Sequence, residues 1–271
     1  MNKTILTLSL LFSTSLYAVD LKTVAEKSDW KITGQSDEVA RLCKDFQKTY
    51  PKKVKCRVYG KTPEGHPLHA LIVGDLTKPT LWAQAGIHAG EIDGKDAVFW
   101  ILREALEGKI ADPFQDVSLV FIPIVNQDGH DRFGKWNRPN QVGPEEMGWR
   151  TTAQNLNMNR DFAKAEAPEM QALLRLWHEI DPLLSLDLHV TDGAHFQPEV
   201  GLIILPNPDH GQTPLHHAGL KLEESMLAKM KARSRLALNF YPSFEDEENP
   251  LSGFSRYVSG PRFSQGYWSN C

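Results

Sequence analysis

The pattern of apolar and polar positions predicts strands that alternate with helices along most of the chain. Apolar runs with the length and composition of strands occur at 54–59, 68–73, 80–87, 117–125, 183–190 and 201–205. Apolar residues recur with helical spacing at 36–49, 95–106, 166–180 and 214–231. The segment 130–157 contains several Pro and Gly residues and is predicted to be a loop, and the last forty residues show no long periodic element.

This order of elements predicts the fold class. Strands that are apolar along their whole length are typical of sheets covered on both faces. We therefore expect an α/β fold with a mixed, mainly parallel sheet flanked by helices. In such sheets, functional residues collect beyond the carboxyl ends of the strands. His88, the segment Asn126–Gly129 and His189 each follow the end of a predicted strand.

Composition and the N-terminus indicate where the chain works. The 271 residues carry a formal net charge of −4, which generates no basic field, so nucleic acid is not an expected partner. Residues 1–18 resemble an export signal, with Lys3 before a short apolar stretch and a small-residue cleavage pattern at the end. The alternative is an N-terminus that is disordered or docks on the core. Because the apolar stretch is too short to span a bilayer, we expect a secreted or periplasmic protein without a membrane anchor.

The chain has three cysteines. Cys43 lies in the first predicted helix and Cys56 in the strand that follows. In an oxidising compartment the two could form a disulfide between helix and strand. Two independent buried thiols are the alternative, and sequence leaves both open. Cys271 is assigned no role.

Three side chains have the chemistry of a catalytic metal site. His88 and Glu91 are three positions apart, and His189 follows 98 residues after Glu91. Two histidines and one carboxylate can hold Zn²⁺ and leave a fourth position open, although the same set also suits iron or manganese. Strand alternation places Asp187 on the same face as His189. For His88 alone, an ordinary loop histidine is the alternative.

A polar segment between these ligands suits the binding of a carboxylate. Asn159 and Arg160 can hold a carboxylate through charge-assisted hydrogen bonds, and Arg150 lies nine residues before Asn159. The alternative is a polar loop whose arginine forms a structural salt bridge. His195 is the one other histidine expected near the cleft.

Four motifs in this order resemble the zinc carboxypeptidases of the carboxypeptidase A type. They are Gly86-Ile87-His88-Ala89-Gly90-Glu91, Asn126-Gln127-Asp128-Gly129, Asn159-Arg160-Asp161 and Asp187-Leu188-His189. The resemblance covers about residues 50–270 and implies that residues 19–271 form one carboxypeptidase-like domain.

The resemblance also implies roles for individual residues. His88, Glu91 and His189 match the zinc ligands, and Asn159 and Arg160 match the pair that binds the terminal carboxylate of a peptide substrate. Arg150 matches the arginine that stabilises the oxyanion, with Arg138 as the second choice. The implied reaction is hydrolysis of C-terminal peptide bonds through a zinc-activated water.

Two departures from the family pattern stand out. Asn157 occupies the position of an aspartate that supports the first zinc histidine, so we expect a weaker or retuned zinc site. No glutamate matches the general base, although the chain after His189 contains Glu199, Glu223, Glu224, Glu245, Glu247 and Glu248.

We therefore expect a chain cut short before the base, which binds zinc but hydrolyses peptides weakly, because general acid–base catalysis is worth about 10²–10⁴-fold. One alternative function is a catalytically inactive zinc- or peptide-binding protein. Another is a related zinc amidase or deacylase acting on cell-wall peptides or N-acyl amino acids.

Overall fold

The computed structural model describes residues 19–191, 193, 197–204, 214–239, 242–246 and 248–256. Its α-helices are α1 (Val24–Lys27), α2 (Ser36–Thr49), α3 (Asp93–Leu106), α4 (Gln127–Asp131), α5 (Pro168–Ile180) and α6 (Pro214–Ala232). The strands are β1 (Val54–Lys61), β2 (Pro67–Val73), β3 (Thr80–Ala85), β4 (Ser118–Ile122), β5 (Leu184–Leu188), β6 (Val200–Gly201), β7 (Ala237–Leu238), β8 (Pro242–Phe244) and β9 (Phe254–Arg256). The 3₁₀ turns are η1 (Pro113–Gln115), η2 (Met158–Arg160) and η4 (Pro250–Ser252).

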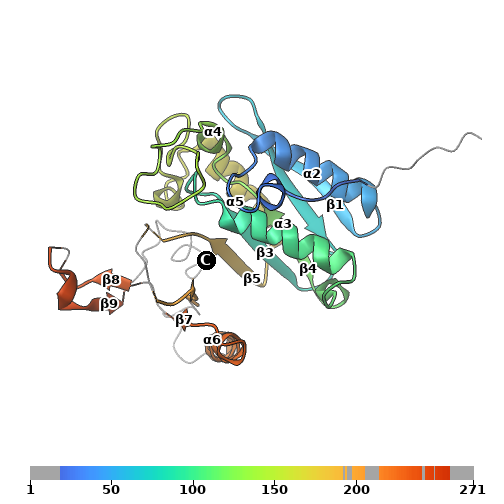
Figure 1. The fold of residues 1–271 in the computed structure, drawn as a ribbon. Coiled ribbons are helices and arrows are strands. Elements are labelled where there is room, and N and C mark those ends of the chain that lie inside the picture. Colours follow the sequence, from blue (N-terminus) through green and yellow to red (C-terminus); the bar gives the residue numbers. More distant parts are fainter. Residues whose placement is uncertain are drawn as a thin grey trace, which may run out of the picture.

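The central sheet has five strands in the order β1-β2-β4-β3-β5 (Figure 1). Strands β3, β4 and β5 are parallel, whereas β1 pairs with β2 and β2 with β4 in antiparallel fashion. The predicted mixed α/β fold is confirmed. The sheet is less parallel than expected. The short turn between β1 and β2 makes a hairpin, and β2 of this hairpin runs antiparallel to β4.

Helices cover both faces of this sheet and so create two cores. One core packs α2 and α3 against side chains such as Leu71, Val73 and Phe121, and Figure 1 shows these two helices on the same face. The other core packs α5 against Ala70, Ile72 and their neighbours. Alternate residues of β2 therefore face opposite cores, which explains why its sequence is apolar throughout.

Helix α3 packs an apolar stripe on the core and also buries a lysine. Phe99, Leu102 and Leu106 belong to the buried stripe, whereas Ile101 is 51% exposed. The buried Lys95 lies on the inner face as well, where it pairs with Glu38 of α2 at 2.8 Å. A charged group buried in this way needs such a partner.

The crossovers place β3 at a topological switch point. The chain leaves β3 through α3 and enters β4 on one side, then returns through α5 to β5 on the other side. Helices α3 and α5 lie on opposite faces of the sheet. A crevice opens at the carboxyl ends of the strands where such crossovers diverge, so His88 and His189 follow neighbouring strands at the same sheet edge.

Shorter elements appear where loops were predicted. The short helix α4 extends into the start of the segment that was predicted as a loop at 130–157. It begins after Asn126, whose side chain accepts the Gly129 N–H. The strand expected at 201–205 is limited to β6 at Val200–Gly201, and residue 205 lies outside the described residues. Strands β6 to β9 form two small sheets, and α6 packs mainly on β7.

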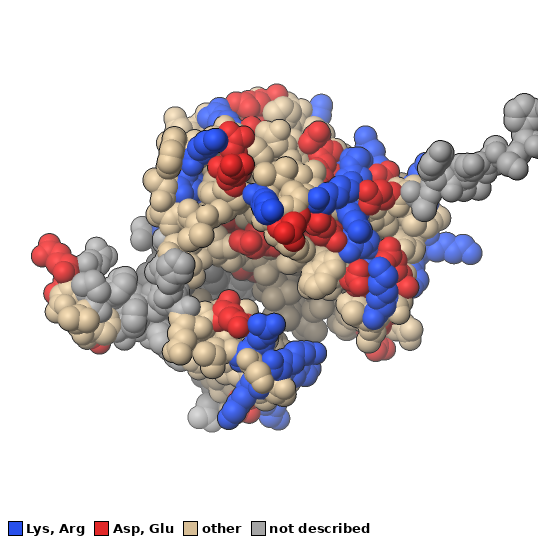
Figure 2. Space-filling view, in the orientation of Figure 1, with Lys and Arg blue, Asp and Glu red and all other residues tan. Residues whose placement is uncertain are grey.

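The predicted export signal at 1–18 lies outside the described residues. Within the described part of the chain, each helix is too short or too polar to cross a bilayer. Figure 2 shows Lys and Arg side chains interspersed with Asp and Glu over the face that it presents.

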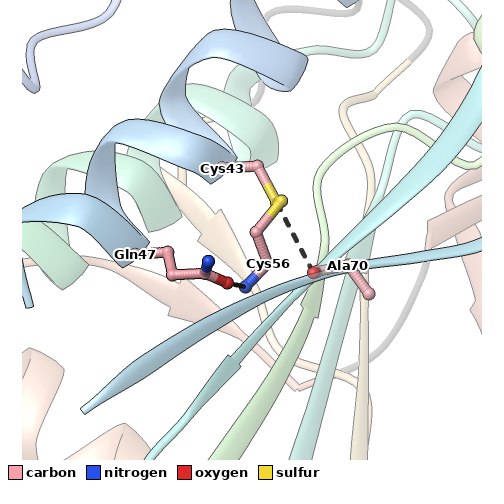
Figure 3. The surroundings of a disulfide bond; sticks show 4 residues. All are labelled: Cys43, Gln47, Cys56 and Ala70. Atoms are coloured by element: carbon pink, nitrogen blue, oxygen red, sulfur yellow. Dashed lines mark hydrogen bonds between the residues drawn. A yellow bond between two sulfur atoms is a disulfide. The ribbon is translucent and has the colours of Figure 1, made fainter. Parts of the chain in front are cut away.

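Cys43 and Cys56 form a disulfide that ties α2 to β1 (Figure 3). Around it, the Gln47 side-chain oxygen accepts the Cys56 N–H at 2.7 Å, and Cys43 Sγ lies 3.6 Å from the Ala70 carbonyl oxygen. Cys43 is fully buried in the core between α2 and the sheet. The bond therefore fixes the outermost strand of the sheet to the helix that covers it.

We expect loss of this disulfide to lower the free energy of unfolding by about 3 kcal/mol, because the bond joins residues 13 positions apart and closing a loop of about that size stabilises a protein by roughly this amount. Urea unfolding of the protein with and without a reductant measures the effect. The Cys43→Ala/Cys56→Ala double variant is the control, since its stability should not respond to the reductant. Equal stability of oxidised and reduced wild-type protein would contradict the expectation.

Glu169 is a buried carboxyl group near the start of α5. Its residue is fully buried, and neither carboxylate oxygen has a hydrogen-bond partner among the described residues. Burial is the main cause that raises the pKa of Glu169, and the nearby carboxylates of Asp128 and Asp161 also raise it. The ionised form is therefore costly in the folded protein.

The Glu169→Gln variant should be more stable than wild type at pH 8, by about 1 kcal/mol. Because the pKa of Glu169 is higher in the folded than in the unfolded chain, the carboxyl group destabilises the fold only above its unfolded pKa. The gain should therefore vanish below about pH 4. Thermal unfolding across pH measures it, with the exposed Glu224→Gln as control; a variant less stable than wild type at pH 8 would show that the Glu169 carboxylate is needed.

Candidate metal centre

The loop between β3 and α3 brings His88 and Glu91 together. The Glu91 N–H donates to the His88 carbonyl at 3.1 Å, which closes a turn. Gly90 within this turn has φ +93°, and a Cβ there would lie 2.9 Å from Arg138 Cγ. The turn thus needs glycine for both its backbone conformation and its close approach to Arg138.

The three candidate ligands meet around the Glu91 carboxylate. His88 Nδ1 lies 3.0 Å from Glu91 Oε1, and His189 Nδ1 lies 2.9 Å from Glu91 Oε2. The two imidazole centroids are 5.0 Å apart, and one donor atom from each of the three residues lies within 4.8 Å of the others. Side chains that are about a hundred residues apart in sequence thus form a single cluster of nitrogen and oxygen donors.

The cluster holds Glu91 ionised inside the protein. Burial alone would raise the pKa of Glu91, whose side chain is 3% exposed, but hydrogen bonds from His189 and His88 lower that pKa well below its ordinary value. Burial lowers the pKa of His88 in spite of its contact with Glu91. His189 is different: burial lowers its pKa, yet the Asp187 and Glu91 carboxylates outweigh that effect and raise it to about 10.

A chain of hydrogen bonds from the sheet orients His189. Its Nε2 lies 3.0 Å from Asp187 Oδ2, and Gln84 Nε2 donates to Asp187 Oδ1 at 3.0 Å. Trp82 Nε1 in turn donates to Gln84 Oε1 at 3.0 Å. Asp187 and His189 share a side of β5 as strand alternation predicted. Such a carboxylate behind a histidine fixes which ring nitrogen faces the metal.

Two arginines from the long loop after β4 reach the same carboxylate. Arg138 is 3% exposed and donates to Glu91 Oε1 at 2.9 Å and to the Ala89 carbonyl at 2.8 Å. Arg150 is 34% exposed; its guanidinium lies 3.0 Å from His88 Nε2 and 3.6 Å from Glu91 Oε1. The inner arginine is therefore enclosed by the protein, and the outer one is partly exposed beside the cluster. Sequence analysis missed the Arg138–Glu91 ion pair because the partners lie 47 residues apart.

Asn159 and Arg160 lie on the 3₁₀ turn η2. Asn159 is buried and Arg160 is half-buried, with one guanidinium N–H donating to the Asn159 carbonyl at 2.6 Å. Asn157 caps this turn, since its side-chain oxygen accepts the Asn159 N–H at 3.1 Å. The Asn157 side chain has no hydrogen bond to His88 among the described contacts, since the ring nitrogens of His88 contact Glu91 and Arg150. A weaker or retuned zinc site stays a prediction.

Two glutamates after His189 have partners outside the cluster. Glu199 pairs with Arg235 at 3.1 Å, and Glu223 accepts from Asn239 at 3.0 Å. In the described part of the chain beyond His189, no glutamate hydrogen-bonds to the three candidate ligands. Glu247 and His195 lie outside the described residues.

The donor set fits a zinc ion. Two imidazole nitrogens and one carboxylate oxygen are the ligands of catalytic zinc sites, and the acid behind His189 completes the usual arrangement. A second group of possible donors, Glu64, His66 and Asp128, lies near the β1–β2 hairpin. In that group Glu64 already pairs with Arg132 at 2.7 Å and His66 with Asp128 at 3.0 Å.

Comparisons with known proteins show which family this chain resembles. Residues 39–200 match the family described as zinc carboxypeptidase. Mouse carboxypeptidase A6 is 27% identical over 124 residues, which cover 41% of this chain and 28% of that protein. The chain thus spans less than a third of that relative's length.

Solved structures share the fold. A metallo-carboxypeptidase from Burkholderia cenocepacia matches with TM-score 0.60 and 19% identity over 86% of this chain and 56% of its own. Bovine thrombin-activatable fibrinolysis inhibitor, solved with tick carboxypeptidase inhibitor, matches with TM-score 0.59 and 17% identity over 77% of this chain and 76% of its own. With the family match covering more than half of its residues, the chain belongs to the zinc carboxypeptidase family.

Proposed function

We propose that this chain contains the zinc centre of a metallocarboxypeptidase that removes C-terminal residues from peptides. The observation that carries the proposal is the meeting of His88, Glu91 and His189 around one point. These three residues would hold the ion, with Glu91 as its anionic ligand. Bound there, Zn²⁺ supplies Lewis-acid polarisation of the scissile carbonyl and activation of a water molecule.

The remaining residues of the site have separate roles in this proposal. Asp187 and Gln84 keep His189 in the orientation that points Nδ1 inward. Arg138 neutralises Glu91 from the buried side. Arg150, on the exposed side, is placed to donate hydrogen bonds to the carbonyl oxygen as negative charge develops on it.

Asn159 and Arg160 would bind the terminal carboxylate of the peptide. A guanidinium matches a carboxylate in a bidentate geometry, which distinguishes a free C-terminus from an amide. The general base stays unassigned, and slow turnover by this chain stays a prediction. We also propose that the protein works outside the cytoplasm, and the Cys43–Cys56 disulfide supports an oxidising compartment.

The zinc-loaded chain should hydrolyse a blocked peptide with a free C-terminal carboxylate and leave the C-terminal amide of the same peptide intact. Arg160→Lys should lower kcat/KM for the acid by about 10–100-fold, because a bidentate charged hydrogen bond is lost. The exposed arginine of α5 provides the control variant, Arg175→Lys, which should behave as wild type.

If turnover is slow, calorimetry measures the affinity of the protein for the same two peptides. Equal affinity for acid and amide, or an Arg160→Lys variant that retains wild-type discrimination, would contradict the proposed carboxylate site. Hydrolysis of the amide alone would favour the amidase alternative.

A further inference from the structure

A cavity of about 320 Å³ lies next to the candidate metal centre. Three separate parts of the chain line it: the N-terminal segment with Trp30, the start of α3 with Ile92, and the loop that contains Val142. Val190, two residues after the end of β5, also lines it. The volume is within the range of small-ligand sites.

The chain connects this cavity directly to the metal ligands. Ile92 follows Glu91 and Val190 follows His189. Arg150, Asn159 and Arg160 are not among the residues described as its lining. If Asn159 and Arg160 hold the terminal carboxylate of a peptide, the cavity would therefore receive another residue of that peptide, on the amino side of the scissile bond.

The outer wall of the cavity is apolar and held in place. Trp30 is 54% exposed and packs edge-on against Trp100, with ring centroids 6.3 Å apart. Asp29 and Trp30 both have positive φ, at 55° and 62°, a conformation that costs non-glycine residues about 1–2 kcal/mol each. Exposed aromatic surface kept in a strained backbone is typical of binding sites.

An ion pair and a hydrogen bond fix this N-terminal wall to α3. Glu26 pairs with Arg103 at 2.6 Å, and Thr33 Oγ1 donates to Asp96 Oδ2 at 3.0 Å. In Figure 1 the blue N-terminal turn lies against the start of α3. The cavity is therefore built by packed elements rather than by a single loose loop.

The charge of the cavity is negative. Its described lining includes two acids, Asp93 and Asp96, and no Lys or Arg. Asp96 is buried and lies 2.8 Å from Lys95, a lysine that it shares with Glu38. Asp93 is exposed at the first position of α3 and has no ion-pair partner among the described residues. An apolar wall and the carboxylate of Asp93 thus face the same space.

We propose that this cavity is a subsite for a basic residue of the peptide, on the amino side of the scissile bond. This inference rests on the proposed function. The aliphatic stem of a Lys, Arg or other diamino acid packs against Trp30 and Val142, while its cationic head pairs with Asp93. Asp93 is then a specificity-determining residue, and it takes no part in the chemical step.

The test compares matched peptides on the zinc-loaded full chain. Each peptide has the same C-terminal residue and carries lysine, norleucine or glutamate at one of the two positions before the scissile bond. Norleucine keeps the aliphatic stem of lysine and removes the charge. We expect lysine to exceed norleucine in kcat/KM by about five- to tenfold at one of these positions.

Two variants of the same residue test the origin of the preference. Asp93→Asn should bring the lysine-to-norleucine ratio close to one, and Asp93→Lys should reverse it in favour of glutamate. Asp116→Asn, which changes an exposed aspartate outside the cavity, should keep the wild-type ratio. Wild-type protein without a lysine preference, or an Asp93→Asn variant that keeps it, would overturn the subsite.

Binding separates this inference from the proposed reaction. Calorimetry with ketomethylene analogues of the same peptides measures affinity without hydrolysis. If no peptide is cleaved but the lysine analogue binds more tightly in an Asp93-dependent way, the subsite stands and the proposed activity fails. If peptides are cleaved and the analogues bind equally, the activity stands and the subsite is wrong.

Discussion

The buried carboxylate of Glu91 is the interaction on which the site depends. A carboxylate taken out of water is stable only when charged or hydrogen-bonding partners surround it. Here the partners come from three parts of the chain: His88 from the same loop, His189 from β5, and Arg138 from the loop after β4. Glu91 therefore joins a sheet edge and a long loop, and the same charge makes the cluster suitable for a divalent cation.

The parallel strands explain why these partners meet. Strands β3 and β5 are hydrogen-bonded neighbours, so the residues that follow them emerge side by side. Helices α3 and α5 then leave on opposite faces and keep the sheet edge open. The hydrogen bonds through Asp187, Gln84 and Trp82 extend from this edge into the core, so the position of His189 depends on the packing of the sheet.

Sequence analysis predicted the parts of this structure that depend on local patterns. The apolar runs located strands β1 to β5, and their ends indicated which side chains converge. It did not predict the antiparallel pairing of β2 with β4, because pairing direction is determined by the hairpin and not by the pattern of a single strand. Nor did it predict that Lys95, a charged residue, is buried on the inner face of α3.

Contacts between distant segments were beyond the reach of sequence patterns. Arg138 pairs with Glu91 across 47 residues, and the side chain of Asn157 caps a local turn. The cavity beside the site arises from the N-terminal segment, α3 and a loop together, so no single motif signals it. Each of these features follows from packing geometry, which residue spacing does not contain.

The most direct test of the account is a crystal structure of the full chain grown with zinc, with anomalous scattering recorded at the zinc edge. The account predicts one strong peak per chain, bonded to His88 Nδ1, Glu91 and His189 Nδ1. A zinc ion bound instead at Glu64, His66 and Asp128, or no peak between His88 and His189 at saturating zinc, would contradict it.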